Sequence, residues 1–570
     1  MGLNEILPAR TEVVRDIELD QKEVTPVADA QAGVQKIEAI TLTWSKPSLY
    51  AALVLIWLLT LVNGMRGSIL ASLTPYITSA WQSHSLLTVI GIVANALSAA
   101  VYIPMAKILD VWGRAEGFLI MTFFCVLGLV LMAASKNLPM YCAADVFYTI
   151  GFSGLGYTWD VLATDVTNLR NRGLAFVFTS SPAIITALAG SRAAQSFVTN
   201  VTWRWGVGCW AIVLPAFALP IYALLKYNQI KAKKTGVYIE ENGLRRNFKS
   251  VITFLAVEMD LPGVLLFAGG LTVFLLPFTL ASSAHDGWRS GHIIAMIVVG
   301  FVALVVFGLY ESFLAPKPFP NGHYLADRTV MGACLLDFVY QVSYYCYALY
   351  FTSFLQVVYD LDVAEAGYVA NTFSAVSFVF LFLAGYLIRI TGRFKWILYI
   401  CVPLYIFSLG LMIHFRTPNG YIGYVVMCEI FFSVAGSIFI LVVQLAVLAA
   451  VDHQHVAAVL SLLFVTGTVG DAVGNTVSGV IWTNTFKKAL TRNLPASAQP
   501  RLATIYGSLP AQLSYAVGIP ERLGIQRAYG YTQTRMLAAA TAIMVVGFVC
   551  TAMMRNLNVK KMTQTRGNVL

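Results

Sequence analysis

Five carboxylates stand inside strongly apolar stretches of this 570-residue chain: Asp145, Asp160, Asp337, Glu429 and Asp471. A charge at mid-membrane costs at least about 2.5–3.5 kcal/mol on insertion scales, so such a group is a candidate for function. A carboxyl group that is alternately buried and hydrated can exchange a proton, which makes all five proton-coupling candidates. A fixed ion pair, for example Asp145 with Arg192 or Arg66, is the competing interpretation. For Asp145 and Asp160, near the ends of their predicted helix, both interpretations stay open.

Tyrosines accompany one of these acids in the stretch "LDFVYQVSYYCYALYF" (336–351). Asp337, Tyr340, Tyr344 and Tyr347 recur at helical spacing and therefore share one face. Phenols can hydrogen-bond a bulky, carbonyl-rich ligand while their rings contact its apolar parts, although a stripe that only packs on neighbouring helices is the alternative. The set of substrate-binding candidates is completed by other polar or aromatic side chains: Asn63, Arg66, Arg192, Tyr529 and Tyr531.

A charged, glycine-containing motif occurs twice. The stretches are "AKILDVWGRAEG" (106–117) and "GYLIRITGRFKW" (385–396), and the shared spacing is charged residue, two positions, Gly-Arg. Repeats of this kind are typical of secondary transporters that rock one half against the other, with charges that pair in one state and separate in the next. A plain loop anchor is the alternative. The predicted gating residues are Asp110, Gly113, Arg114, Glu116, Asp165, Arg170, Arg172, Arg389, Gly392 and Arg393.

The elements that must position these residues are membrane-spanning helices. The chain is 58% hydrophobic and only 12% charged, whereas globular domains are about 25% charged. Apolar runs of about 20 residues suffice to span a bilayer as helices, which satisfy their own backbone hydrogen bonds. About fourteen such runs predict an all-α integral membrane protein: 50–72, 86–106, 116–135, 141–162, 174–196, 205–226, 261–281, 292–313, 329–354, 365–390, 395–415, 421–447, 456–481 and 535–555.

The runs divide into two six-helix halves, 48–226 and 329–555, with two inserted helices at 261–313. The remaining segments are a disordered N-terminal tail (1–47), a basic loop (227–260), an outer loop within the second half (482–534) and a C-terminal tail (556–570). Lys and Arg concentrate in alternate connections, which predicts cytoplasmic N- and C-termini. The net charge of +10 then indicates anchoring against anionic lipid rather than nucleic-acid binding.

Several other classes of protein lack support. No G-x-x-x-x-G-K-[ST] loop is present, so an ATP motor of the P-loop kind is not expected. The histidines are scattered and the cysteines lie singly in apolar runs, so we expect no metal site, no cofactor and no enzyme activity.

The stretch 106–117 resembles the loop motif of the major facilitator superfamily, although Ala106 replaces the usual leading glycine and Val111 the usual arginine. Fourteen helices suit the larger variant of that fold. Four stretches also resemble fungal siderophore–iron transporters: "LTPYITSAWQSHSLLTVI" (73–90), "AKILDVWGRAEGFLIM" (106–121), "DVLATDVTNLRNRGLAFVFTSSPAIITALAG" (160–190) and "WRWGVG" (203–208).

This resemblance implies proton-driven import of ferric siderophores, with iron held by the ligand and not by the protein. The hydroxamate type is expected because it is the common ligand of that family, and the outer loop is expected to help receive it. The expected partners are the siderophore, protons and the lipid bilayer of a plasma or endosomal/vacuolar membrane, with the protein as a monomer. A proton-coupled multidrug exporter of the same fold is the alternative, and a receptor or scaffold without transport is a third interpretation.

Overall fold

The computed structural model describes residues 32–165, 167, 169–235, 257–316, 322–418, 420–451 and 455–561. All regular elements in these residues are helices. Twelve helices are long and apolar enough to cross a membrane: Lys46–Ser79, His84–Val111, Arg114–Ala134, Asn171–Thr199, Trp203–Lys234, Leu261–Leu280, Gly291–Leu314, Val363–Thr391, Lys395–Phe415, Ile422–Ala449, Val456–Asn493 and Pro520–Met553.

Two further helices, α6 (Leu138–Asp165) and α15 (Arg328–Ala348), run through the same bundle. They are not among the twelve, and they carry several of the acids and tyrosines singled out by the sequence. With them, each of the fourteen predicted runs has a helical counterpart, which confirms the all-α membrane fold. The predicted number of membrane-spanning helices, fourteen, is approximate, because twelve helices meet the criteria of length and apolar composition.

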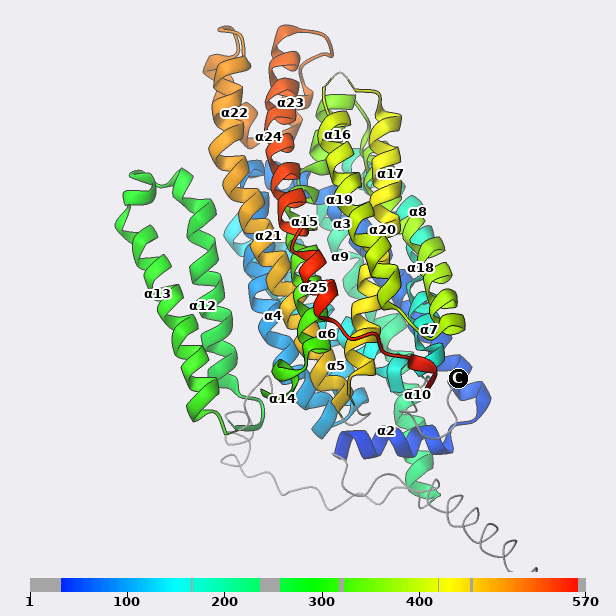
Figure 1. Ribbon diagram of the computed structural model, residues 1–570. Coiled ribbons are helices and arrows are strands. Elements are labelled where there is room, and N and C mark those ends of the chain that lie inside the picture. Colours follow the sequence, from blue (N-terminus) through cyan, green and yellow to red (C-terminus); the bar gives the residue numbers. More distant parts are fainter. Residues whose placement is uncertain are drawn as a thin grey trace, which may run out of the picture.

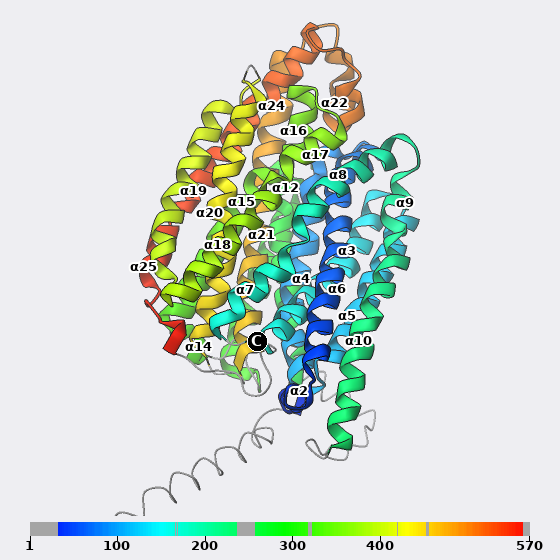
Figure 2. The same ribbon diagram turned by 90° about the vertical axis from the view of Figure 1, so that its right-hand side faces the viewer.

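The helices form two groups that lie on opposite sides of the molecule in Figure 2. The N-terminal group comprises α3 (Lys46–Ser79), α4 (Leu87–Val111), α5 (Arg114–Ala134), α6, α7 (Leu169–Ser180), α8 (Ala183–Thr199), α9 (Trp203–Gly208) and α10 (Trp210–Lys234). The C-terminal group comprises α15, α16 (Phe351–Tyr359), α17 (Val363–Ala370), α18 (Thr372–Thr391), α19 (Lys395–Phe415), α20 (Ile422–Ala449), α21 (Val456–Asn493), α24 (Pro520–Met544) and α25 (Gly547–Met553). The hairpin α12 (Leu261–Leu280) and α13 (Gly291–Leu309) stands at one side, and α12 packs against α4 and α21 (Figure 1).

Two helical paths of the C-terminal group are interrupted. The path from α15 to α16 breaks at 349–350, and the path from α17 to α18 breaks at Asn371. Broken helices free backbone groups and are tolerated at membrane depth where protein or a cavity surrounds them. The interruptions therefore mark the place to look for a site.

The two motif repeats form matching turns on one end of the bundle, which we name the turn face. Gly113 and Gly392 both have positive φ, at 115° and 73°, a conformation that favours glycine. Each turn is held by a segment near a chain end. Lys36 of α2 (Ala32–Thr43) donates to the Trp112 carbonyl at 2.7 Å, and the Val559 N–H donates to the Gly392 carbonyl at 2.9 Å.

The helix α2 differs from the expectation of a disordered tail over 1–47. It lies across the turn face (Figure 1), where Ile37, Ile40 and Trp44 are buried. This burial stabilises a short helix that the polar local sequence did not predict. Residues 1–31 lie outside the described part of the chain.

At the opposite end, which we name the extended face, α21 and α24 continue well past the apolar runs (Figure 1). The 38 residues of α21 span about 57 Å, more than the roughly 40–45 Å of a bilayer with its headgroups. The prediction of an outer loop over 482–534 was therefore wrong in its bounds. Only 494–519 connect the two helices, and this connection contains α22 (Leu502–Gly507) and α23 (Leu509–Leu513).

Candidate functional site

A cavity of about 260 Å³ lies where the two helix groups meet. Its lining comes from α3, α4, α15, α16, α17, α18 and α20 and from both helix interruptions. The lining residues are Ala71, Thr74, Pro75, Leu87, Tyr344, Tyr345, Tyr347, Ala348, Leu349, Phe351, Thr352, Ala370, Asn371, Phe373 and Glu429. Glu429 is the one carboxylate or cation among them.

Glu429, Tyr344 and Tyr347, all selected from sequence, meet in this cavity. Glu429 is only 2% exposed, and its Oε1 atom has no hydrogen-bond partner among the described residues. Tyr344 stacks on Phe432 with ring centroids 6.0 Å apart. Tyr340 lies outside the lining, because it packs against Tyr405 and Phe439. On the predicted tyrosine face, Tyr344 and Tyr347 thus line the cavity, whereas Tyr340 packs against neighbouring aromatic side chains.

Arg416, which the sequence indicated only as a basic residue of a short connection, is buried behind the cavity wall at 1% exposure. Its guanidinium carbon lies 4.0 Å from the ring centre of Phe351 and 5.3 Å from that of Tyr347, both lining residues. Its Nε and Nη2 atoms have no hydrogen-bond partner within the described ranges. Its position after the apolar run 395–415 is the only sequence signal for this role.

Asp337 and Asp471 lie where α15 packs against α21. A Cβ placed on Gly467 would be 2.3 Å from Oδ2 of Asp337, so glycine at this position leaves room for the carboxylate. One carboxylate oxygen of Asp471 has no hydrogen-bond partner in the described residues. These two acids do not line the cavity with Glu429.

Asp160 has a partner in the opposite group, because the Gln444 amide donates to its carboxylate at 3.2 Å. Tyr157 donates to the Ala457 carbonyl at 2.5 Å. Both bonds join α6 to the C-terminal group on the turn side of the cavity.

The remaining candidates of the N-terminal group lie apart from the cavity lining. Arg66 is buried with its guanidinium carbon 4.1 Å from the ring centre of Tyr148. Asn63 is buried and donates to the Leu59 carbonyl at 3.0 Å. Asp145 is also buried, and no hydrogen bond or ion pair at contact distance engages it within the described chain.

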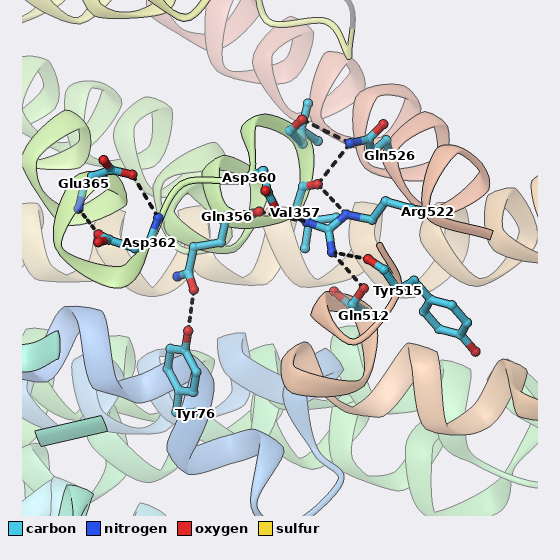
Figure 3. Close-up of polar contacts among 11 residues, drawn as sticks. Tyr76, Gln356, Val357, Asp360, Asp362, Glu365, Gln512, Tyr515, Arg522 and Gln526 are labelled. Carbon is cyan, nitrogen blue, oxygen red and sulfur yellow. Dashed lines mark hydrogen bonds and ion pairs between the residues drawn. The ribbon is translucent and has the colours of Figure 1, made fainter. Parts of the chain in front are cut away.

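Polar contacts between the two helix groups close the extended face, and Figure 3 shows the one between Tyr76 and Gln356. Tyr76 of α3 donates to the side chain of Gln356 of α16. Asn371 donates to Ser68 and Ser191, both at 3.0 Å. Arg192 is exposed and donates to Gln195, which in turn donates to Asp362 at 2.9 Å. The cavity is thus bridged on both its sides.

The two tyrosines predicted in the outer loop have different surroundings on α24. Tyr529 is fully buried and donates to Gln512 at 2.7 Å. Tyr531 is exposed and lines a cleft of about 370 Å³ whose charged residues are all basic, namely Lys488, Arg492 and Arg527. Only Tyr531 is open to solvent.

Asp110 and Arg114 of the first repeat form a buried cluster with Asp165, and Arg172 is also buried. Arg114 Nε donates to Asp165 at 2.9 Å, and Arg114 Nη1 lies 3.4 Å from Asp110. Arg172 donates to the carbonyls of Thr164 and Thr167. Glu116 forms an ion pair with Lys226 of α10.

The second repeat has a different arrangement. Arg389 reaches a pocket with Thr167 and Asn171 of the N-terminal group, whereas the side chain of Arg393 is exposed. The side chain of Arg170 lies outside the described part of the chain.

The profile of the Major Facilitator Superfamily matches residues 56–475. Solved structures share the fold at low identity. A bacterial homologue of the human lysosomal transporter Spinster, inward-facing and occupied, is 16% identical with a TM-score of 0.51, over 89% of this chain and 97% of its own. The peptide transporter POT in complex with sulfate is 13% identical with a TM-score of 0.53, over 89% and 96%. The protein is a major facilitator.

Curated fungal relatives narrow the family. "MFS siderochrome iron transporter B" of Aspergillus fumigatus is 63% identical over 97% of this chain and 89% of its own length. "Siderophore iron transporter mirB" of Emericella nidulans is 59% identical over 96% and 91%. "MFS siderochrome iron transporter 1" of Gibberella zeae is 56% identical over 96% and 90%. The chain belongs to the fungal siderophore–iron transporter family, as the sequence motifs predicted.

Proposed function

We propose that the protein imports ferric siderophores together with protons by exposing the central cavity alternately to the two sides of the membrane. The cavity between the helix groups, with Glu429 and three tyrosines on its wall, carries the proposal. Its volume of about 260 Å³ is below the roughly 300–1,000 Å³ of ligand sites. A bulky ligand therefore needs one of the two bridged sides to open.

Glu429 and Arg416 are the proposed coupling pair. An uncompensated buried charge is costly, so Glu429 is stable when it carries a proton or when it faces the Arg416 charge. Opening the cavity to water allows the proton to exchange. A ligand that pushes Glu429 away from Arg416 favours the protonated carboxyl group, so that ligand and proton are carried in the same direction.

The charge of the cavity supports a hydroxamate ligand. A ferric tris-hydroxamate complex is neutral, whereas a ferric catecholate complex is anionic. The lining residues include no lysine or arginine to bind an anionic complex, while phenols and the Asn371 amide can hydrogen-bond the carbonyl-rich periphery of a neutral one. We further propose that the protein resides in the plasma membrane or in an endosomal or vacuolar membrane. In either membrane, the turn face and both termini would lie on the cytoplasmic side.

Uptake of radiolabelled ferric siderophores by fungal cells lacking other importers tests the proposal. We expect uptake of a hydroxamate complex but not of a catecholate complex, and a protonophore should abolish it. The variant Glu429→Gln should lose proton-driven uptake, whereas Asp286→Asn, at an exposed carboxylate of the α12–α13 connection, should retain it. Absence of uptake by protein at the cell surface would refute import.

A further inference from the structure

We propose that residues 499–515 form a lid over the extended face of the cavity, and that Arg522 is the positioning residue that fixes this lid to the C-terminal helix group. The inference rests on the alternating access proposed above, and it assigns the closing contacts on one side. The lid contains α22 and α23.

Arg522 has a complete set of hydrogen bonds although its side chain is fully buried. A guanidinium has five N–H donors, and five acceptors surround this one. They are the carbonyls of Val357 (3.0 Å), Gln356 (3.1 Å), Gln512 (3.0 Å) and Tyr515 (3.4 Å) and the carboxylate of Asp360 (3.2 Å). Figure 3 shows these bonds converging between the end of α16 and the end of α23 with the residues that follow it.

The consequence is that α16 and the lid are held together. Gln526, one helical turn further along α24, adds bonds to the carbonyls of Val357 and Val358. Gln512 also accepts from Tyr529 and donates to the Ile505 carbonyl at 2.7 Å. The lid, α16 and α24 therefore move as one unit with the C-terminal group.

The unit formed by the lid, α16 and α24 contacts the N-terminal helix group at the end of α3 and at the residues that follow it. The Leu509 N–H donates to Ser79 Oγ at 3.0 Å, and Ser85 Oγ donates to the Tyr506 carbonyl at 2.5 Å. Tyr76 donates to Gln356, whose own carbonyl Arg522 binds. These three bonds, two from the lid and one from α16, are the contacts of this unit that we assign to closure, and they break when the extended face opens.

The contacts assigned to closure lie at the edge of the cavity. Thr74 and Pro75 line the cavity immediately before Tyr76, and Thr352 lines it one turn before Gln356. The hydrogen bonds from Arg522 to the carbonyls of 356 and 357 fix the position of Gln356. Loss of these hydrogen bonds should weaken closure of the extended face without altering any residue that lines the cavity.

Labelling of a cysteine at Thr74 with a membrane-impermeant thiol reagent measures closure without any substrate. The half-buried Cys142 and Cys209 are first replaced by serine. Removal of one hydrogen bond in Tyr76→Phe should raise the open population, and hence the labelling rate in intact cells, about fivefold. Arg522→Lys should raise it at least as much, and Arg501→Ala, at an exposed arginine of the lid, should leave it unchanged.

Uptake kinetics give the second readout. A shift toward the open extended face should lower both the apparent KM for external ligand and the maximal rate, which a purely structural defect would not do. Unchanged labelling in Tyr76→Phe and Arg522→Lys that reach the surface would overturn the proposal. If Arg522→Lys does not reach the surface, Tyr76→Phe decides alone. Because labelling needs no siderophore, failed uptake with increased labelling would reject the proposed substrate and not the lid.

Discussion

Gly467→Ala tests the close approach of α15 and α21 around Asp337. The added Cβ would lie 2.3 Å from Oδ2 and 3.3 Å from Cγ of Asp337, about 1 Å inside an ordinary contact to the oxygen. The atoms it meets all belong to the Asp337 side chain, so this buried carboxylate must shift. Overpacking of this kind costs typically about 1–3 kcal/mol, partly offset by the roughly 0.5–1 kcal/mol that alanine gains over glycine within a helix.

The net expectation is a destabilisation of about 1–2 kcal/mol, which for a chain of 570 residues corresponds to an apparent melting temperature lower by roughly 1–2 °C. Fluorescence-detected size-exclusion chromatography of the detergent-solubilised protein after heating measures it. Gly410→Ala on α19 is the matched control, because a Cβ there meets nothing within 4 Å.

A double-mutant cycle identifies the cause of the effect. In an Asp337→Ala background the carboxylate is gone, so Gly467→Ala should cost little or nothing. Two outcomes would refute the assignment of Asp337 as the group that a side chain at 467 displaces. One is equal stability of Gly467→Ala and Gly410→Ala. The other is a destabilisation by Gly467→Ala that is just as large in the Asp337→Ala background.

Two further predictions concern the turn face. Arg114→Ala should destabilise the protein by about 3–5 kcal/mol, because it removes the buried cation that binds both Asp110 and Asp165. Arg393→Ala, at the exposed position of the second repeat, should change stability by less than about 0.5 kcal/mol. Melting temperatures and surface amounts of the two variants test this difference, and equal effects would contradict the argument. Partial burial alone would raise the pKa of Asp327, but hydrogen bonds from two backbone N–H groups at the start of α15 and the charge of Arg555 hold that pKa below its ordinary value. The capping contribution of Asp327 to stability, about 1 kcal/mol, is thus present above the unfolded pKa of about 3.9 and is lost as pH falls through the lower folded pKa. Asp327→Ala should therefore lower the melting temperature at pH 7. If the variant still melts at a lower temperature than the parent protein below both pKa values, the ionised carboxylate is not the cause.

The candidate site was predictable only in part. Glu429, Tyr344 and Tyr347 were recognisable because an acid or a regular phenol stripe is unusual within an apolar helix. Arg416 and Arg522 look like surface cations in the sequence, and their burial depends on helices distant in the chain. Tyr529 and Tyr531 are two residues apart on the same helix, yet only the packing of α24 decides that one is buried and the other exposed.

The sequence by itself determined the properties that arise within one helix or one turn. Apolar length produced the membrane helices, and two Gly-Arg motifs produced two turns with glycine at positive φ, since both depend on a few consecutive residues. The tertiary structure decided which of the acids faces the cavity, because helix rotation is set by neighbours such as Gly467 against Asp337. It also decided the true ends of α21 and α24. Their polar extensions remain helical because they pack on each other and on the lid, a stabilisation that no measure of local hydropathy contains.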